Sequence, residues 1–470
     1  MENSPASIIF TPALDFQMGL EPTVEEWQAL VGVVQEFLAR QLQNLDESPI
    51  LEVDPAPPLS GPTVDLQEYL EQLFKSGFNT SHPGFLAYIP GGGLLTSALA
   101  DWIIKTTNRY GTAHFAAPNL ADLEFQVIQT FCEWVGYDDR AAGVLTTGGS
   151  LANFTAVVTA RRAKLPEDFL DGVLYCSEQT HHSVMKAANL AGFSSRNLRL
   201  LPTDDNFRLE PAALEQQILR DRSAGLSPFL VIASAGTTNT GSIDPIPAIA
   251  NICAEHKLWL HVDAAYGGAF VLTARGRERL KGLHLADSIT LDPHKGMFLP
   301  YGTGSILVRD RNALIEAHEM RGEYMPDLDH SRAHLDPFSL SVELSREHRG
   351  LKIWLPLMIH GREAFEQALD EKLDLADYVY QELLKIPDLQ ILNQPELTTV
   401  VFKLRGSGES ADKQNQALLD AINAQQQVFL SGTSLNGQYV LRVSILSHRT
   451  HREQIDGLLN SLHNALKEVG

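Results

Sequence analysis

The sequence predicts an α/β protein built on a parallel sheet, followed by a smaller α+β domain. From about Gly143, short apolar runs alternate with helical patterns, and each run is apolar on both faces, as strands of a covered parallel sheet are. From Leu351 the pattern changes to long helices, then to alternating strands and a last helix. The seven runs are GVLTT, GVLYCS, NLRLLP, FLVIASAG, LWLHVDAA, SITLD and GSILVRD.

Two helices are predicted before this repeat. Thr23-x-x-Glu26 has the form of a capping box, and apolar residues from Trp27 to Leu42 recur at i, i+3 and i+4 spacing. A proline-rich linker over residues 47–62 precedes a second helical pattern over residues 63–74. Because neither helix belongs to a βα repeat, we expect the pair to be an arm that docks on its own chain or on a partner.

The length and pattern of the chain predict three parts. At 470 residues the chain is long enough for two or three domains. We expect an N-terminal helical arm over residues 1–94, a large α/β domain over residues 95–352 and a small α+β domain over residues 353–470.

The composition is that of an ordinary soluble globular protein, with 44% hydrophobic and 20% charged residues. A net charge of −21 argues against nucleic acid or an anionic membrane as partner, because both require clustered Lys and Arg. No run is apolar and long enough to span a membrane, and the start MENSPASIIFTPALDF lacks a basic segment followed by an apolar one, so we expect a cytoplasmic protein. Cys132, Cys176 and Cys253 lie far apart and predict neither a disulfide framework nor a zinc site.

Polar residues follow several of the predicted strands, where ligands of a doubly wound sheet bind. TTGGSLAN, Thr146 to Asn153, joins a strand to a helical pattern, and its glycines and helix N-terminus suit a phosphate group. A plain turn is the alternative. His181 and His182 follow the strand GVLYCS, where they are also consistent with a surface feature of a helix N-terminus.

Asp263 and Lys295 are the sharpest candidates. Asp263 follows LWLHV and precedes Ala264 and Ala265, so its carboxylate is expected in a low-dielectric site where a cation or a protonated ring nitrogen must meet it. A helix cap or a pair with an arginine is the alternative. Lys295 ends SITLDPHK. The alternative to a functional role is a lysine whose side chain extends from a loop into water. A third strand end carries Thr237 and Thr238.

Taken together, these residues match the needs of pyridoxal 5′-phosphate (PLP). The cofactor requires a lysine for its Schiff base, an acid that keeps the pyridine nitrogen protonated, and a cup for its phosphate. A lysine kept partly dry is a neutral nucleophile.

Over most of its length the chain resembles the group II PLP-dependent amino acid decarboxylases, which include aromatic-L-amino-acid and glutamate decarboxylases. The motifs that carry the resemblance are HPGFLAYIP, ALADW, GTAHFAAP, the phosphate cup, HHSV, HVDAAYGG, DPHK and SREHRGLKIW. The resemblance implies the aspartate-aminotransferase fold (fold type I), with a mostly parallel seven-stranded sheet in the large PLP-binding domain. It also implies a homodimer with both active sites at the interface, which gives the N-terminal arm a role in dimerisation.

The resemblance also implies roles for single residues. Lys295 matches the Schiff-base lysine, Asp263 the partner of the pyridine nitrogen, and His181 the catalytic histidine that stacks on the ring. Tyr324, in the loop RGEYMPDLDH, matches the catalytic loop tyrosine. Asp292 stands where aromatic-amino-acid decarboxylases have an asparagine near the phosphate, and a carboxylate there must point away or pair. The expected catalytic residues are Lys295, Asp263, His181, Tyr324 and His294, and the expected cofactor contacts are Gly149, Ser150, His181, Thr238, Asp263, Ala265, Asp292, His294 and Lys295.

By the same match, Tyr88, Ile89 and Pro90 line the substrate side, together with Tyr110 and Thr112. An aromatic side chain stacked on Tyr110 is favoured, although Arg109 leaves an acidic substrate open. No metal is expected.

The predicted reaction is decarboxylation of an L-amino acid to a primary amine and CO2. Other PLP reactions remain alternatives: oxidative aldehyde formation, for which relatives tend to have Phe at the loop tyrosine, transamination, or decarboxylation of an acidic or aliphatic amino acid. A non-enzymatic PLP-binding scaffold would be expected to lack the lysine or the aspartate, and this sequence has both.

Overall fold

A computed structural model of the chain describes residues 23–52, 66–319 and 336–469. The chain divides into two compact units, residues 1–82 and 83–470. In the first unit, α1 (Val24–Gln43) and α2 (Leu66–Lys75) pack through Phe37 and Phe74, whose ring centroids lie 5.5 Å apart. β1 (Leu51–Glu52) pairs with β2 (Gly77–Phe78) in an antiparallel ladder.

The predicted capping box at the start of α1 is confirmed. The Thr23 hydroxyl accepts the Glu26 N–H at 3.2 Å, and the Glu26 carboxylate accepts the Thr23 N–H at 2.7 Å. Both bonds satisfy N–H groups that the first helical turn leaves without acceptors.

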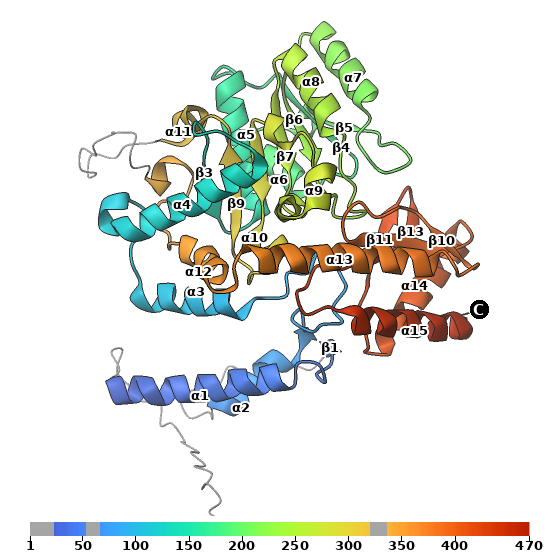
Figure 1. Cartoon of the computed structure of the whole chain (residues 1–470). Helices are drawn as coiled ribbons and strands as arrows, with labels where there is room; N and C mark the ends of the chain where they lie inside the picture. The colour runs from blue at the N-terminus through green and yellow to red at the C-terminus, as the bar shows by residue number, and fades with distance from the viewer. Residues whose placement is uncertain (1–22, 53–65, 320–335, 470) are drawn as a thin grey trace, which may run out of the picture. The chain divides into compact units, whose positions relative to one another are not determined.

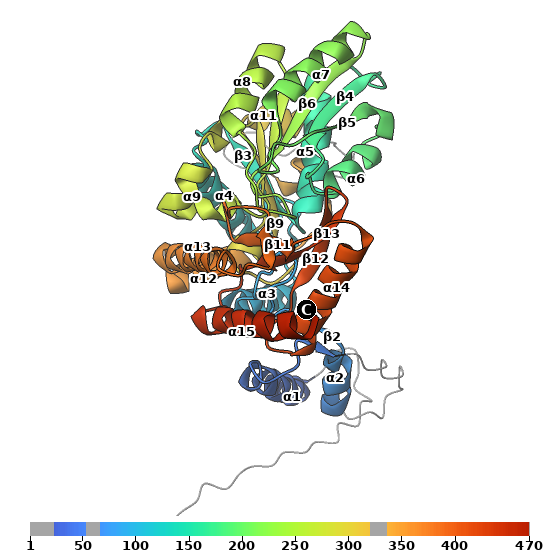
Figure 2. The ribbon, with the colours of Figure 1, turned by 90° about the vertical axis from the view of Figure 1, so that its right-hand side faces the viewer.

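The second unit contains the predicted seven-stranded sheet, with strand order β3-β9-β8-β7-β6-β4-β5 (Figures 1 and 2). β9 is antiparallel to both of its neighbours and every other pairing is parallel, so the sheet is mostly parallel, as expected. All seven predicted runs are strands: β3 (Ala142–Thr146), β4 (Gly172–Ser177), β5 (Leu198–Leu201), β6 (Ser227–Ser234), β7 (Trp259–Asp263), β8 (Ser288–Leu291) and β9 (Gly304–Val308).

Helices cover both faces of this sheet. One apolar core packs under α5 (Gly149–Lys164), α6 (Ser183–Leu190) and α11 (Arg311–His318), and a larger core packs on the opposite face under α4 (Pro118–Val135), α7 (Pro211–Ser223) and α8 (Ile246–His256). Successive side chains of a strand point in turn into one core and then the other, which explains why the runs are apolar on both faces. The remaining helices of this part are α3 (Leu95–Thr107), α9 (Ala274–Arg279) and α10 (Pro293–Gly296).

The C-terminal part has its own antiparallel sheet, of order β10-β11-β13-β12. Its strands are β10 (Leu389–Ile391), β11 (Thr399–Leu404), β12 (Ser431–Leu435) and β13 (Gln438–Ser444), and its helices are α12 (Gly350–His360), α13 (Arg362–Leu383), α14 (Glu409–Ala424) and α15 (Arg452–Val469). Ile353 in α12 and Leu369 in α13 pack in the larger core of the first sheet, whereas Val379 packs in the core of the second. Helix α13 therefore joins the two cores, and the domain boundary between residues 352 and 353 stays a prediction. Within the described ranges, no helix has the length and hydropathy that a membrane span requires.

One buried carboxylate of this unit has an unusual environment. Asp244 is 2% exposed and accepts the N–H groups of Leu209 and Ser234, each at 2.7 Å. Burial raises the pKa of Asp244 to about 6, although the two N–H donors lower it.

Asp244 therefore predicts a pH-dependent stability. The pKa of Asp244 is higher in the folded protein than in the unfolded chain. Its contribution to the free energy of unfolding is therefore complete below about pH 4 and is lost as the pH rises through about 6. Asp244→Asn lacks this titration, so the free energy of unfolding of the wild type should fall relative to that of the variant by up to about 3 kcal/mol between pH 4 and pH 7. Urea unfolding at several pH values measures this difference, and a difference that stays constant with pH would contradict it.

Candidate active site

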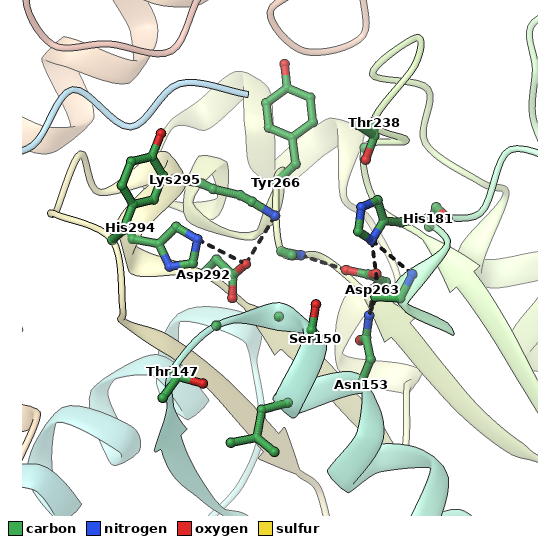
Figure 3. A pocket seen from close by; sticks show the side chains of 18 of the residues that line it. Thr147, Ser150, Asn153, His181, Thr238, Asp263, Tyr266, Asp292, His294 and Lys295 are labelled. Carbon is green, nitrogen blue, oxygen red and sulfur yellow. Dashed lines mark hydrogen bonds and ion pairs between the residues drawn. The ribbon is translucent and has the colours of Figure 1, made fainter. Parts of the chain in front are cut away.

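Two neighbouring strands carry polar residues on the face that α5 covers. Along β7, Trp259, His261 and Asp263 share one face because side chains alternate. In β8, Ser288 pairs with His261, and Thr290 with Asp263. This polar ladder ends at the carboxyl ends of the strands, where Asp263 lies beside the start of α5 (Figure 3).

Lys295 lies in α10, the short helical turn after β8. Its Nζ is 3.1 Å from Asp292 Oδ2, and its side chain is 25% exposed. The other oxygen of Asp292, Oδ1, is buried and has no hydrogen-bond partner among the described residues. His294 donates its Nδ1–H to the Thr303 carbonyl at 2.6 Å, and its Nε2 is 3.6 Å from Asp292 Oδ2. Burial lowers the pKa of His294, although the Asp292 carboxylate opposes this.

The predicted phosphate cup lies at the start of α5. Gly149 and Ser150 are its first residues, and N–H groups of a first helical turn have no acceptor within the helix. A Cβ on Gly149 would lie 2.8 Å from Asp292 Oδ2, so only glycine lets the α5 backbone approach this carboxylate so closely.

The structure brings the expected cofactor residues to one cavity of about 330 Å³. Figure 3 shows Lys295 and Asp292 on one side of it, Asp263 and His181 on the other, and Ser150 between them. All the expected cofactor contacts line it: Gly149, Ser150, His181, Thr238, Asp263, Ala265, Asp292, His294 and Lys295.

Asp263 and His181 are held in fixed orientations. Asp263 is 9% exposed; its Oδ2 accepts from Asn153 Nδ2 at 2.8 Å and its Oδ1 from the Ala265 N–H at 3.1 Å. His181 Nδ1 accepts the Ser183 N–H at 3.3 Å, so the proton of the neutral ring is on Nε2. Burial lowers the pKa of His181, which favours that neutral ring.

The expected substrate residues lie outside the lining of this cavity in the described part of the chain. Tyr88, Ile89 and Pro90 precede Gly91, which packs so closely on the backbone of His294 that a Cβ would lie 1.9 Å from its carbonyl oxygen. Tyr110 is 50% exposed, while Thr112 is buried and its hydroxyl donates to the Leu344 carbonyl. Their contact with substrate stays a prediction. Tyr324 lies outside the described residues.

Three residues that the sequence analysis did not select contribute to the site. Asn153 lies three residues after Ser150, and this helical spacing places both on the face that lines the cavity. Tyr266 also lines the cavity, and its hydroxyl contacts Thr398 Oγ1 at 2.7 Å. Arg442, 3% exposed, comes from β13 and donates to the Thr238 carbonyl, a contact between distant segments that no local pattern indicates.

A family model described as the pyridoxal-dependent decarboxylase conserved domain matches residues 54–405. The chain belongs to this family. An aromatic-L-amino-acid decarboxylase of Bacillus atrophaeus is 34% identical to it over 414 residues, 86% of this chain and 86% of that relative. An acidic amino acid decarboxylase of Xenopus tropicalis is 31% identical over 350 residues, 73% of this chain and 68% of that relative. A crystal structure of Oryza sativa TDC with PLP and tryptamine has a TM-score of 0.90 at 24% identity, covering 96% of this chain and 99% of that one.

Membership of the pyridoxal-dependent decarboxylase family confirms the predicted activity and cofactor. The chain is a PLP-dependent amino acid decarboxylase, and its fold is the fold type I that the motifs implied.

The residues of the cavity also fit PLP on their own chemistry. A primary amine, a buried carboxylate and a helix N-terminus supply groups for an aldehyde, a ring nitrogen and a phosphate. The small side chain of Ala265 leaves room on one side of a flat ring, and His181 offers a second ring.

The close approach at Gly149 generates a test of the cup. In Gly149→Ala the Cβ would lie 2.8 Å from Asp292 Oδ2 and 3.3 Å from the Ala265 Cβ, so the start of α5 must shift. We expect the apoprotein to bind PLP at least about tenfold more weakly, as measured by fluorescence titration. The matched control is Gly457→Ala in α15, where a Cβ meets nothing within 4 Å. Equal PLP affinity of the two variants would contradict the assignment of the cup.

Proposed function

We propose that this decarboxylase converts an aromatic L-amino acid to its primary amine and CO2, with Lys295, Asp263 and His181 around the reacting centre. The observation that carries the proposal is the convergence of these side chains and the α5 N-terminus on one cavity. The 34% identity to an aromatic-L-amino-acid decarboxylase over 86% of the chain supports the substrate class.

Bound PLP supplies an electron sink for the carbanion that remains when CO2 leaves. Lys295 Nζ would provide the amine that holds the cofactor. The Asp263 carboxylate would keep a proton on the ring nitrogen, and its bonds to Asn153 and Ala265 fix its plane. His181 would cover the ring and exclude water from that face. For Tyr324, the proposed donor of the proton to the substrate Cα, support comes from the sequence resemblance alone.

Asp292 keeps a place in the proposed phosphate site because a cation lies beside it. Its Oδ2 lies 3.1 Å from Lys295 Nζ. The N–H groups at the start of α5 add positive potential on the phosphate side. This pairing supports a place for the Asp292 carboxylate near a phosphate dianion.

An acidic substrate is the second candidate. It is supported by the 31% identity to an acidic amino acid decarboxylase and by Arg109, which precedes Tyr110 in the chain. The aromatic candidate is favoured because the aromatic-L-amino-acid decarboxylase matches at higher identity over a larger share of this chain.

A homodimer is proposed from the apolar surface of α3 and α12, which pack against each other. Seven large apolar side chains of these helices are at least 37% exposed, and a surface of this kind marks an interface. They are Leu95, Leu99, Trp102, Ile103, Trp354, Met358 and Ile359.

The three buried, unpaired cysteines support a reducing location such as the cytoplasm.

A substrate screen tests the proposed function. The wild type should release CO2 from L-tryptophan, L-tyrosine or L-DOPA with a kcat/KM at least about tenfold above that for L-glutamate or L-aspartate, a difference of about 1.4 kcal/mol in transition-state binding. Lys295→Ala is the control and should release none, because no other described amine lines the cavity. A preference for the acidic amino acids would establish the second candidate instead.

The proposed dimer predicts the effect of charge on α3. Leu99→Glu with Ile103→Glu should give a monomer in analytical ultracentrifugation, because two carboxylates would be desolvated at the interface. Leu219→Glu on α7, a position 51% exposed, is the control and should leave the wild-type dimer intact. A double variant that sediments as the wild type does would exclude this face as the interface.

A further inference from the structure

Asn153 lies at the centre of a buried hydrogen-bond network that joins two sides of the cavity. Its amide Nδ2 donates to Asp263 Oδ2 at 2.8 Å and to Ser183 Oγ at 3.0 Å. Its Oδ1 accepts from Thr290 Oγ1 at 2.8 Å and contacts His261 Nε2 at 3.0 Å. Asn153 is 1% exposed, so no bulk water competes for these bonds. The amide uses both of its donors and both lone pairs of its acceptor.

The donors of this network have one consistent direction. The Trp259 indole N–H can only donate, so Ser288 Oγ accepts it at 2.8 Å, and the Ser288 hydroxyl is free to donate to His261 Nδ1 at 2.8 Å. His261 therefore carries its proton on Nε2 and donates it to Asn153 Oδ1. Burial lowers the pKa of His261 to about 4, so this ring is neutral and needs an acceptor for one proton only.

The same direction continues into the cavity. Ser183 Oγ accepts from Asn153, so its own hydrogen is free for His181 Nδ1, 2.8 Å away. The Ser183 backbone N–H also donates to His181 Nδ1, at 3.3 Å, and this bond keeps the proton of His181 on Nε2. Asn153 thus fixes the plane of the Asp263 carboxylate, whereas the backbone of Ser183 fixes the tautomer of His181.

We propose that Asn153 is a positioning residue for this decarboxylase, which aligns Asp263 with the ring nitrogen of PLP. This inference rests on the role proposed above for Asp263. An aspartate of the same shape cannot replace Asn153, because it lacks the donor and would place a second carboxylate 2.8 Å from Asp263.

Four variants test the proposal. Asn153→Leu removes the amide at similar volume, and Asn153→Asp keeps its shape without the donor. Ser183→Ala interrupts only the branch to His181. The matched control is Thr155→Val, which removes a buried hydroxyl on the same helix that bonds only to the Leu151 carbonyl of its own chain segment. Circular dichroism verifies that each variant is folded.

Three measurements are made without turnover. Nitrogen NMR of histidine-labelled apoprotein, with the His181 signals assigned by their loss in His181→Asn, reports the tautomer of His181. Titration with PLP reports the affinity of the apoprotein, and the nitrogen signal of ring-labelled PLP reports protonation of the ring nitrogen. We expect both Asn153 variants to bind PLP about tenfold or more weakly and to lose part of the ring-nitrogen proton, while His181 keeps its Nε2–H form because the Ser183 N–H still donates to its Nδ1.

Ser183→Ala keeps the backbone N–H that donates to His181 and leaves the bond from Asn153 to Asp263, so it should match the wild type in ring-nitrogen signal and PLP affinity, as Thr155→Val should. The proposal is overturned if Asn153→Leu or Asn153→Asp, once folded, keeps the wild-type ring-nitrogen signal and PLP affinity. If Asn153→Leu does not fold, Asn153→Asp decides. Failure of the wild type to release CO2 from any amino acid would overturn the proposed function instead, and it is measured separately.

Discussion

The buried polar ladder on β7 and β8 is the constraint on which the site depends. Buried polar groups require hydrogen-bond partners, and His261, Asp263, Ser288 and Thr290 are all at most 9% exposed. A helix with only apolar side chains on this face would leave Asp263 Oδ2, His261 Nε2 and the Thr290 hydroxyl without the partner that Asn153 supplies from α5. This requirement constrains where α5 crosses the sheet. Because Gly149 begins the same helix, satisfying the ladder also brings the helix N-terminus to the strand ends.

The electrostatics of the cavity follow from the same arrangement. The chain carries a net charge of −21, yet the proposed phosphate site lies next to Asp292. Positive potential is concentrated locally instead, from Lys295 within 3.1 Å of that carboxylate and from the first N–H groups of α5. A global charge thus says little about the ligand of a buried site, because at such distances nearby charges dominate. The net charge therefore argues only against partners that bind over an extended surface, such as nucleic acids, and not against a small anion in a buried site.

Much of this site could be predicted from the sequence because its residues follow strands directly. Lys295, Asp263 and Gly149 stand at strand ends within recognisable runs, and parallel topology brings strand ends together without further information. Asn153 carries a local signal, its helical spacing from Ser150, but its partners His261 and Thr290 come from two other strands. Such partners depend on register and helix placement, which no single segment encodes.

The second sheet contacts a residue of the cavity wall, a contact that only the folded chain makes visible. Arg442 on β13 is buried, and burial lowers its pKa to about 10, so it remains charged at neutral pH. Among the described residues no carboxylate pairs with it; its guanidinium donates to the carbonyls of Thr238, Asn239 and Tyr88. A buried charge satisfied by backbone carbonyls restrains the segments that carry them. Since Thr238 lines the cofactor cavity and Tyr88 belongs to the expected substrate side, one arginine couples the position of both to the C-terminal sheet.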